Sequence, residues 1–358
     1  MPTFKPVALT EIGCEIFEAA GCTPEHTREL VEHLVESSLF GHDSHGVLRF
    51  YEYIQCFEKG TWNPRGTPRI VQERPCTAVV DGGGAMGQVG GAFATRLAMR
   101  KAREQGMGTV TLRNSCHLGR CGAYPLMAAR EGMIGLAFVN AGRLGRQVAP
   151  YGGIDGKLST NPIAFAAPRR NSDPIMVDMA TSATAEGKIR ITSNRSLPLK
   201  EGWVIDSNGS PTTDPRKFTG DPAGAILPLG GVAGHKGYCL SFVVELLGGG
   251  LSGQGCASGE HVMKSNGVLL TVYDIAHFTD LESYYEDVET LVRHIRTSRI
   301  DPDIGEILLP GEFEFRNARK RKVDGIEIDD TTWSNICATA ETNLRLETDR
   351  WNEMAISI

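Results

Sequence analysis

The first part of the chain shows the hydrophobic spacing of amphipathic helices. In residues 24–40, PEHTRELVEHLVESSLF, Leu30 and Leu34 belong to an apolar stripe with helical spacing, and acidic residues come early, near the positive end of a helix dipole. Residues 47–60, VLRFYEYIQCFEKG, repeat the pattern and end at a glycine, a common helix terminator. We predict two helices here, joined by the polar segment between them.

From residue 76 onward, strand-like and helix-like stretches alternate. Strands are predicted for CTAVVDG, GMGTVTLRNS and MIGLAFVNA, and helices for GGAFATRLAMRKAREQG and GAYPLMAAREG between them. Later, strand-like stretches such as KLSTNPIAFAAP, PIMVDMATS and WVIDSNGSPTT follow one another without helices, before a helix at about 237–250 and a strand GVLLTVYDI. This order predicts an α/β fold whose sheet is mixed and contains antiparallel pairs.

The length of the chain, 358 residues, is enough for about two domains. Its last part returns to charged, helix-like sequence, as in the N-terminal part. We therefore expect a helical N-terminal segment, 1–75, that packs with a helical C-terminal segment, 282–358. The residues between them, 76–281, would form a central mixed-sheet domain.

Composition argues against several classes of protein. Lys and Arg total 37 against 43 Asp and Glu, a net charge of −6, which disfavours a nucleic-acid-binding surface. The N-terminal MPTFKPVALT lacks a signal pattern, and no uncharged apolar run approaches the ~18 residues of a membrane span. Nine scattered cysteines without a CxxC pair predict free thiols. We expect a cytoplasmic protein with neither nucleic-acid nor membrane partners.

The segment GGGAMG, residues 82–87, matches GxGxxG between a strand and a helix, as in dinucleotide-binding folds. That fingerprint also requires an acidic residue about 20 positions later, at the end of the second strand. Here the second strand, TVTLRNS, ends without one, and Glu104 lies in the preceding helix. We therefore interpret these glycines as a turn.

The decapeptide GHDSHGVLRF, residues 41–50, concentrates reactive side chains between the two N-terminal helices. Ser44 is predicted to cap the second helix, which would place His45 in its first turn with Arg49 and Tyr53 on the same face. There the helix dipole and the guanidinium would favour a neutral histidine able to take a proton, and Arg49 would clamp a carboxylate. The alternative is that the segment only caps and links the helices.

Two further clusters follow predicted strands. In NSCHLGRCGAY, His117 comes directly after a strand, where active-site loops are common. Cys116, His117 and Cys121 match no standard zinc spacing, so we expect no metal site. In VDMATSATAEGK, Asp178 ends a strand and either orients a histidine from elsewhere or caps a helix. GVAGHKGY and LPGEF suit either cofactor loops or ordinary turns.

The chain resembles the malate/L-lactate dehydrogenase family of NAD(P)-dependent oxidoreductases through seven motifs in order: GHDSHGV with Arg49, NSCHLGRCGAY, STNPIAFAAP, VDMATSATAEGK, NGSPTTDP, GHKGY and LPGE. It is most similar to the hydroxycarboxylate dehydrogenases. The resemblance implies a non-Rossmann α/β fold of the L-sulfolactate/malate dehydrogenase type. Such a fold has a mixed, largely antiparallel sheet flanked by helices and a helical N- and C-terminal domain. It also implies NAD or NADP as cofactor, and a homodimer with its active site between domains.

The resemblance also implies roles for individual residues. His45 would be the proton donor and acceptor with Asp178 as its partner, but His117 matches the base of some members, so both histidines are candidates. Ser44 and Arg49 would bind the substrate carboxylate. Cofactor contacts are expected at His45, Gly119, Arg120, Cys121, Met176, Val177, Asp178, Met179, Ala180, His235, Lys236, Pro310, Gly311, Glu312 and Phe313.

The implied reaction is reversible hydride transfer between C2 of a 2-hydroxy acid and nicotinamide, with a histidine moving the hydroxyl proton. The substrate would be lactate, malate or a larger hydroxycarboxylate. Alternatives within the family are a reductase of cyclic 2-imino acids and a ureidoglycolate-type dehydrogenase. Alternatives outside it are a metal-dependent hydrolase using His42, His45 and His117, and a non-catalytic ligand-binding module.

Overall fold

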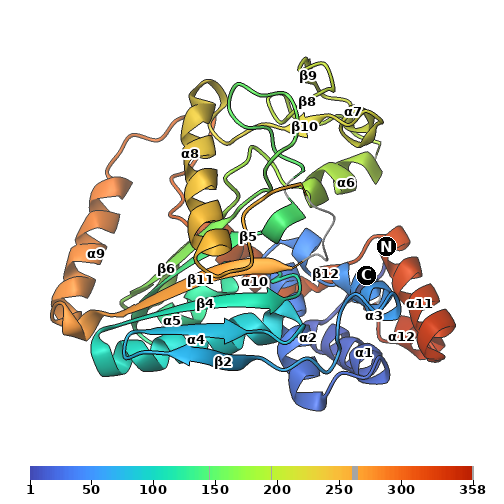
Figure 1. The fold of residues 1–358 in the computed structure, drawn as a ribbon, viewed down its shortest axis with the longest axis horizontal. Coiled ribbons are helices and arrows are strands. Elements are labelled where there is room, and N and C mark those ends of the chain that lie inside the picture. The colour runs from blue at the N-terminus through green and yellow to red at the C-terminus, as the bar shows by residue number, and fades with distance from the viewer. Residues whose placement is uncertain (145, 195, 260–264, 357–358) are drawn as a thin grey trace.

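The computed structural model describes residues 1–144, 146–194, 196–259 and 265–356. A seven-stranded sheet in the order β2-β3-β4-β11-β5-β6-β7 forms its centre (Figure 1). Only β3 and β4 are parallel; the other neighbouring pairs of this sheet are antiparallel. This confirms the predicted mixed, largely antiparallel sheet. The strands are Arg69–Glu73 (β2), Thr77–Asp81 (β3), Met107–Ser115 (β4), Met133–Asn140 (β5), Ile163–Arg169 (β6), Ser172–Met179 (β7) and Asn266–Asp274 (β11).

Strand β11 lies at the centre of the sheet and is buried on both faces. Val268 and Leu270 belong to the core formed with α4 (Gly87–Gln105) and α5 (Ala123–Arg130). Leu269 points to the opposite face, because side chains alternate along a strand, and it is also buried. Burial on both faces explains the almost unbroken apolar sequence GVLLTVY.

Helices cover the sheet on both faces: α4 and α5 pack on one face with Val268 and Leu270 of β11, and α8 stands above the sheet in Figure 1. A small sheet of β8 (Val204–Ile205), β9 (Pro211–Thr212) and β10 (Ala225–Ile226) lies near α6 and α7. None of the helices in the described ranges is long and apolar enough to cross a membrane. The remaining helices are α1 (Pro6–Ala19), α2 (Pro24–Leu39), α3 (Arg49–Glu58), α6 (Glu186–Asn194), α7 (Pro215–Thr219), α8 (Gly234–Val244), α9 (Leu281–Arg296), α10 (Glu312–Asp324), α11 (Asp330–Leu344) and α12 (Asp349–Glu353).

The two ends of the chain share one hydrophobic core. Strand β1 (Thr3–Phe4) pairs with β12 (Ile326–Glu327), and the ring centroids of Phe4 and Trp333 lie 4.5 Å apart. The same core contains apolar side chains of α1, α2 and α3 together with those of α10, α11 and α12. Helix α9 instead lies against β6 of the central sheet. The division of the chain at 75/76 and 281/282 stays a prediction.

The structure corrects the predicted start of α3. Asp43–His45 form a 3₁₀ turn, and α3 begins only at Arg49, with no side-chain cap from Ser44. The interruption follows from packing at Gly46, where a Cβ atom would lie 2.0 Å from Oγ of Ser38 on α2. The chain must therefore turn against α2 before it can start a new helix, and His45 does not lie in the first turn of α3.

Gly82 and Gly87, at the two ends of the segment 82–87, make close contacts with the backbone at and just after the end of β4. A Cβ atom on Gly82 would lie 2.7 Å from the carbonyl oxygen of Asn114, and one on Gly87 would lie 2.1 Å from that of His117. Glycine is needed here because the turn before α4 packs directly on that backbone. These contacts support the interpretation of the segment as a turn.

Candidate active site

Two histidines from distant parts of the chain lie side by side. His45 belongs to the 3₁₀ turn before α3, and His117 to the loop that follows β4. Their rings are stacked, with centroids 5.5 Å apart and an interplanar angle of 20°. The two candidates for the proton-transferring histidine therefore occupy the same site.

His45 is held as a neutral ring. Its Nδ1 lies 3.0 Å from the hydroxyl of Ser44. Burial, and after it the positive charge of Arg49, hold the pKa of His45 well below its usual value. The direction of the shift agrees with the sequence prediction, but the helix dipole is not its cause because His45 lies outside α3.

His117 is anchored from behind by a chain of hydrogen bonds. The hydroxyl oxygen of Tyr53, on α3, lies 2.7 Å from Nδ1 of His117. Gln88, at the start of α4, donates from Nε2 to the same hydroxyl at 3.1 Å. Tyr53 is only 1% exposed, and burial raises the pKa of its hydroxyl, which therefore keeps its proton. This chain fixes the orientation of the His117 ring.

Beside the histidines, two arginines share one carboxylate. Arg49 donates from Nε to the carbonyl oxygen of Ser44 at 2.7 Å and forms an ion pair with Glu52. Arg190, on α6, pairs with the other oxygen of Glu52 at 2.8 Å, and its Nη2 is buried without a hydrogen-bond partner in the described residues. Two guanidinium groups on one carboxylate leave an excess positive charge, which suits an anionic substrate.

Asp178, on β7, holds the loop that carries His117. Its carboxylate accepts a hydrogen bond from the backbone N–H of Gly122 at 2.7 Å. The two residues pack so closely that a Cβ atom on Gly122 would lie 2.8 Å from Oδ2 of Asp178. Together with burial, which contributes more, the charge of Asp178 raises the pKa of the neighbouring Cys121 thiol. The predicted pairing of Asp178 with His45 stays a prediction.

The start of this loop rests on α2. The backbone N–H of Arg120 donates to Nε2 of His33 at 3.0 Å. Burial, followed by the charge of Arg120, lowers the pKa of His33 to about 3, so that this ring is neutral and can accept the bond. Gly119 has a φ of +76°, and a Cβ atom there would lie 2.4 Å from Nε2 of His33. Only glycine fits at this position.

The guanidinium of Arg120 ties the loop to α2 and β7 in the interior. It pairs with Glu36 at 2.6 Å and lies over the ring of Phe40, 4.5 Å from the centroid. Its Nη1 lies 3.7 Å from Sδ of Met176. Its Nε is buried and has no partner among the described residues. Arg120 is thus a buried cation stabilised by an anion, an aromatic face and a thioether.

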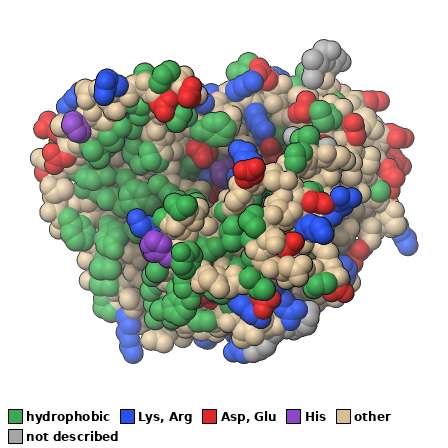
Figure 2. Space-filling model, turned by 90° about the horizontal axis from the view of Figure 1, so that it is seen from above, with side chains coloured by type: hydrophobic (Ala, Val, Ile, Leu, Met, Phe, Trp, Pro, Cys, Tyr) green, Lys and Arg blue, Asp and Glu red, His purple; other side chains and the backbone are tan. Residues whose placement is uncertain are grey.

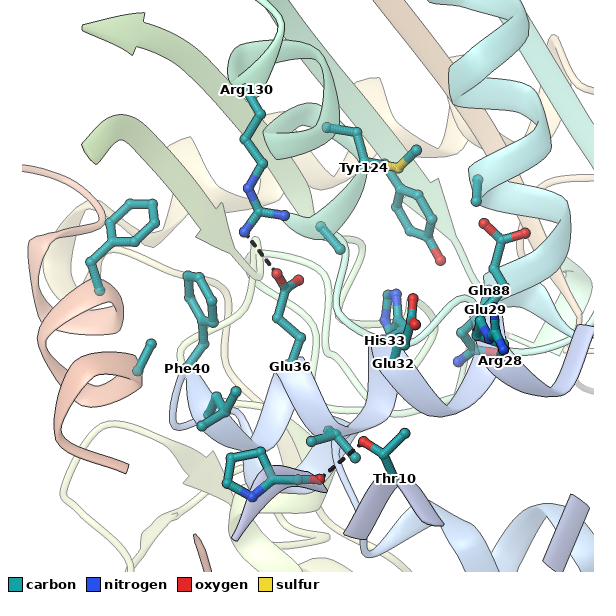
Figure 3. Close-up of a pocket in the computed structure, with 18 of the residues that line it drawn as sticks. Thr10, Arg28, Glu29, Glu32, His33, Glu36, Phe40, Gln88, Tyr124 and Arg130 are labelled. Carbon is teal, nitrogen blue, oxygen red and sulfur yellow. Dashed lines mark hydrogen bonds and ion pairs between the residues drawn. The ribbon is translucent and has the colours of Figure 1, made fainter. Parts of the chain in front are cut away.

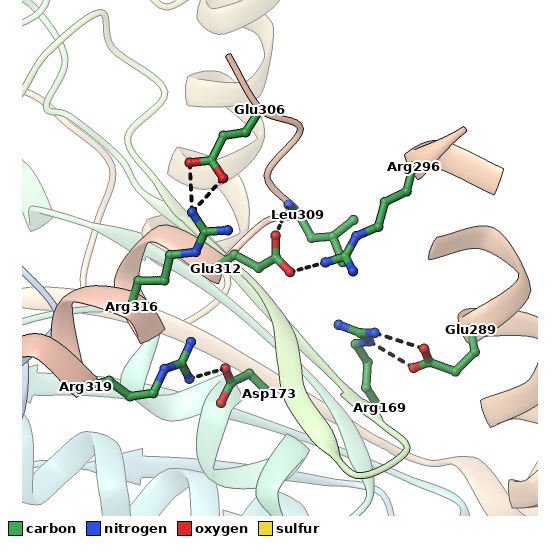
Figure 4. A network of polar contacts seen from close by, with 9 residues as sticks. All are labelled: Arg169, Asp173, Glu289, Arg296, Glu306, Leu309, Glu312, Arg316 and Arg319. Carbon is green, nitrogen blue, oxygen red and sulfur yellow. Dashed lines mark hydrogen bonds and ion pairs between the residues drawn. The ribbon is translucent and has the colours of Figure 1, made fainter. Parts of the chain in front are cut away.

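The segment that contains Pro310 and Gly311, which are expected cofactor residues, contacts β7 at Met176. The N–H of Met176 donates to the carbonyl oxygen of Pro310 at 3.0 Å, and a Cβ atom on Gly311 would lie 3.0 Å from Cβ of Met176. Glu312 pairs with Arg296 of α9, within a network of ion pairs that links α9, α10 and the β6–β7 turn (Figure 4). The structure therefore brings together the segments around Gly119, Met176 and Gly311.

The other expected cofactor residues lie on or just after β7, at the start of α8 and, for Phe313, on α10. The N–H of Leu229, just before α8, donates to the carbonyl oxygen of Thr181, just after β7, at 3.0 Å. This bond connects the two regions. All of the following residues are at least partly exposed: Val177, Met179, Ala180, His235, Lys236 and Phe313.

A cavity of about 1190 Å³ lies behind this site, between α2, α4, α5 and α10. Figure 3 shows Glu36 of α2 reaching across it to Arg130 of α5, with His33 and Gln88 on the wall. Its lining does not include Ser44, His45, Arg49, His117 or Asp178. The cavity is therefore separate from the predicted reaction site, with which it shares a wall. Within the described ranges, no cluster of three or more His, Cys, Asp or Glu side chains could hold a metal ion.

The sequence prediction missed several residues of this site. Glu52 follows Arg49 by three positions on one helix, a spacing that predicts an ion pair and could have been noticed. His33, Gln88 and Arg190 gave no such signal, because their roles come from packing between α2, α4 and α6 and distant loops.

Comparison with known proteins shows to which family the chain is related. The family model for malate/L-lactate dehydrogenase matches residues 4–337. A malate dehydrogenase of Pyrococcus horikoshii is 38% identical over 86% of both chains, and hydroxycarboxylate dehydrogenase B of Escherichia coli O157:H7 is 33% identical over 91% of this chain and 90% of that one.

Solved structures show the same fold. A putative malate/lactate dehydrogenase from E. coli superposes with a TM-score of 0.91 and 30% identity, covering 98% of both chains. A delta1-piperideine-2-carboxylate reductase from Pseudomonas syringae gives a TM-score of 0.83 and 30% identity over 95% of this chain and 100% of that one. The chain belongs to the malate/L-lactate dehydrogenase family.

Proposed function

We propose that the chain catalyses reversible hydride transfer between NAD or NADP and C2 of a 2-hydroxycarboxylate. Family membership makes it an oxidoreductase of the 2-hydroxycarboxylate dehydrogenase type. The observation that carries the assignment to this site is the stacked pair of His45 and His117 beside Arg49. It combines a ring that can transfer a proton with a guanidinium that can bind a carboxylate.

Among the residues expected to hold the cofactor, those at the start of α8 fit such a group. Backbone N–H groups at the start of α8, with the exposed His235 and Lys236, offer positive charge suited to phosphates. A Cβ atom on nearby Gly231 would meet nothing within 4 Å, so this surface is open. The segments around Gly119, Met176 and Gly311 would hold the rest. When bound, the cofactor supplies or accepts the hydride.

Arg49 and Ser44 would orient the substrate carboxylate, and the histidine pair would move the hydroxyl proton. We assign the transfer of this proton to His117, because burial and the charge of Arg49 oppose protonation of His45. Tyr53 anchors Nδ1 of His117, so Nε2 is the nitrogen that would exchange the proton. In oxidation it takes the proton from the hydroxyl, and in reduction it returns it. Asp178 would keep the His117 loop in place.

A second candidate activity is the reduction of cyclic 2-imino acids. The likeness to the piperideine-2-carboxylate reductase supports it, and the same arginine and proton donor would serve a substrate in which nitrogen replaces the 2-oxo oxygen. A ureidoglycolate-type dehydrogenase would need the same groups. The main proposal is favoured by relatives named malate and hydroxycarboxylate dehydrogenases.

We also propose that the protein works as a homodimer through the faces of α8 and α9. Exposed apolar side chains are grouped there: Leu240, Phe242, Val243 and Leu246 on and just after α8, and Leu291 and Ile295 on α9. Figure 2, which looks down on this side, shows hydrophobic side chains spread over much of its left half. Apolar surface of this extent is typical of a protein interface.

Sedimentation velocity would test the dimer with Phe242→Asp and Leu246→Asp together. We expect monomers, because two charges would be buried in the interface. Val7→Asp, at an exposed apolar residue on α1, is the control and should leave the dimer intact. A double variant that sediments as the wild type does would place the interface elsewhere.

We propose a cytoplasmic location. The nine cysteines are free thiols, as proteins of a reducing compartment have. Fractionation of cells that produce the protein would test this location. Recovery of the protein outside the cytoplasmic fraction would contradict the proposal.

A screen of 2-hydroxy, 2-oxo and cyclic 2-imino acids with both nicotinamide cofactors would test the activity, read at the absorbance of the reduced nicotinamide. Turnover of 2-hydroxy and 2-oxo acids is expected, and it should persist after exhaustive chelation. Turnover of imino acids alone would favour the second candidate. Hydrolysis that chelation abolishes would indicate a metal-dependent hydrolase, and binding without any turnover would indicate a ligand-binding module.

A further inference from the structure

Gln88 is a buried residue whose amide is held at one end only. It is 1% exposed, and its Nε2 donates to the hydroxyl of Tyr53, which in turn lies 2.7 Å from Nδ1 of His117. Its Oε1 is buried and has no hydrogen-bond partner in the described part of the chain. A half-turn of the amide exchanges its oxygen and nitrogen without moving any other atom. No second bond opposes that half-turn.

The orientation of this amide decides where the proton of Tyr53 points, because a phenol has only one proton. With Nε2 of Gln88 donating to it, Tyr53 can donate its proton to Nδ1 of His117. The neutral His117 ring then carries its own proton on Nε2. In that form Nε2 has no lone pair with which to accept a proton from a substrate.

The opposite orientation makes His117 a base. With Oε1 facing it, Tyr53 donates its proton to Gln88 and accepts a hydrogen bond from Nδ1–H of His117. Nε2 of His117 then carries the lone pair. The same arrangement also accommodates the doubly protonated ring, whose Nδ1–H still has Tyr53 as its acceptor.

We propose that Gln88 is a positioning residue that controls, through Tyr53, which nitrogen of His117 carries the proton, and that its amide turns its carbonyl toward Tyr53 when His117 acts as the base. The proposal rests on the proposed function. In the oxidation step the substrate O–H bond breaks and an N–H bond forms at Nε2, while the proton at Nδ1 stays in place. Reduction reverses this transfer.

The other titratable groups around His117 and Tyr53 are the same in every variant that is compared below. His45 is stacked on His117 from the 3₁₀ turn. Arg49 and Glu52 of α3, and Cys116 of the β4 end, act on the pKa of Tyr53. Gln88 adds no charge of its own. Its effect on His117 should therefore pass through the Tyr53 hydroxyl and disappear when that hydroxyl is removed.

The experiment measures the His117 ring by nitrogen-15 NMR of histidine-labelled protein, assigned with a His117→Gln variant. Gln88→Met keeps the length of the side chain and removes both polar atoms. We expect the Nδ1–H form of neutral His117 to decrease and the pKa of the ring to fall by about one unit, roughly tenfold in the protonated fraction. The pH profile of kcat/KM for oxidation should shift in the same direction.

The matched comparison repeats the substitution in a Tyr53→Phe background, where Gln88→Met should leave the His117 signals unchanged. An equal shift in both backgrounds, or none in either, would overturn the proposal. Gln88→Leu serves as the second variant if the methionine variant does not fold. The NMR measurement does not depend on turnover. A Tyr53-dependent shift of the His117 signals in a protein without dehydrogenase activity would reject only the proposed function. Dehydrogenase activity without such a shift would reject only the role of Gln88.

Discussion

The rings of His45 and His117 are stacked 5.5 Å apart, yet their surroundings differ. Nδ1 of His45 forms a hydrogen bond with the hydroxyl of Ser44, and burial followed by the charge of Arg49 disfavours the charged form of the His45 ring. His117 has Tyr53 at Nδ1, which can support a charged ring by accepting a hydrogen bond. Of two adjacent rings, the one whose environment tolerates the added proton is the better base.

We therefore predict unequal effects of replacing the two histidines. His117→Gln should slow hydride transfer by about 10² to 10⁴-fold, the usual contribution of a general base. His45→Gln should slow it by only about tenfold, through substrate positioning. Single-turnover measurements of reduced nicotinamide would check this, with substrate affinity measured separately. A larger loss in His45→Gln than in His117→Gln would reverse the assignment of the base.

The fold was predictable from sequence where the hydrophobic period is long and regular. The stripe predicted over residues 24–40 forms α2 (Pro24–Leu39), and the apolar run GVLLTVY lies in the doubly buried strand β11. The start of α3 was not predictable, because Gly46 must pack against Ser38 of a neighbouring helix and this contact breaks the expected cap. Such tertiary contacts override the local preference of a residue for a helix cap.

The site was predictable only as a set of candidate side chains. The motifs pointed to His45, Arg49 and His117, which the structure places close together. The residues that control them, Gln88 and Arg190, lie in other helices and carry no pattern of their own. Their roles depend on hydrogen-bond directions across elements, which a single sequence does not contain.

In the proposed mechanism Glu52 competes with the substrate for Arg49, so removal of the Glu52 charge should strengthen substrate binding. In the structure its carboxylate forms ion pairs with both Arg49 and Arg190. Glu52→Gln would leave two guanidinium groups available to an anionic substrate, and we expect KM for a 2-oxo acid to fall several-fold at low salt, with the gain lost at high salt. Glu282→Gln, in the exposed pair with Arg170, is the control. An unchanged or higher KM would show that Glu52 instead holds Arg49 in its binding position.

His33 should make the protein sensitive to acid. Its pKa is about 3 in the folded protein and 6.5 as its ordinary value. Below pH 6.5 the unfolded chain takes up a proton that folded His33 does not, so stability falls as the pH drops from 6.5 toward 3, by up to about 1.4 kcal/mol per pH unit. Above pH 6.5 both states are neutral, and the contribution does not change with pH.

Urea unfolding of His33→Gln between pH 7.5 and pH 5 would test this. The glutamine can still accept the N–H of Arg120 but does not titrate. We expect a flatter dependence of stability on pH than in the wild type. His294→Gln, at an exposed histidine of α9, should leave the slope unchanged. Equal slopes for His33→Gln and the wild type would assign the acid sensitivity to other groups.

Gly119 and Gly132 have nearly the same backbone angle but different surroundings, and this makes them a matched pair. Their φ angles are +76° and +77°. A Cβ atom on Gly119 would meet His33 at 2.4 Å and Gln88 at 2.8 Å, whereas one on Gly132 would meet nothing within 4 Å. Gly132→Ala should therefore cost only the strain of a left-handed backbone, about 1–2 kcal/mol.

Gly119→Ala should cost clearly more than Gly132→Ala, because His33 or the loop must also move. The loop carries Arg120 and leads to Gly122, which is bonded to Asp178, so the movement should weaken binding of the cofactor as well. Unfolding midpoints would measure the stability of the two variants, and fluorescence titration with NADH and NADPH would measure their affinity. Equal losses of stability, with normal affinity in both variants, would mean that the 119–122 loop moves freely and does not hold the cofactor.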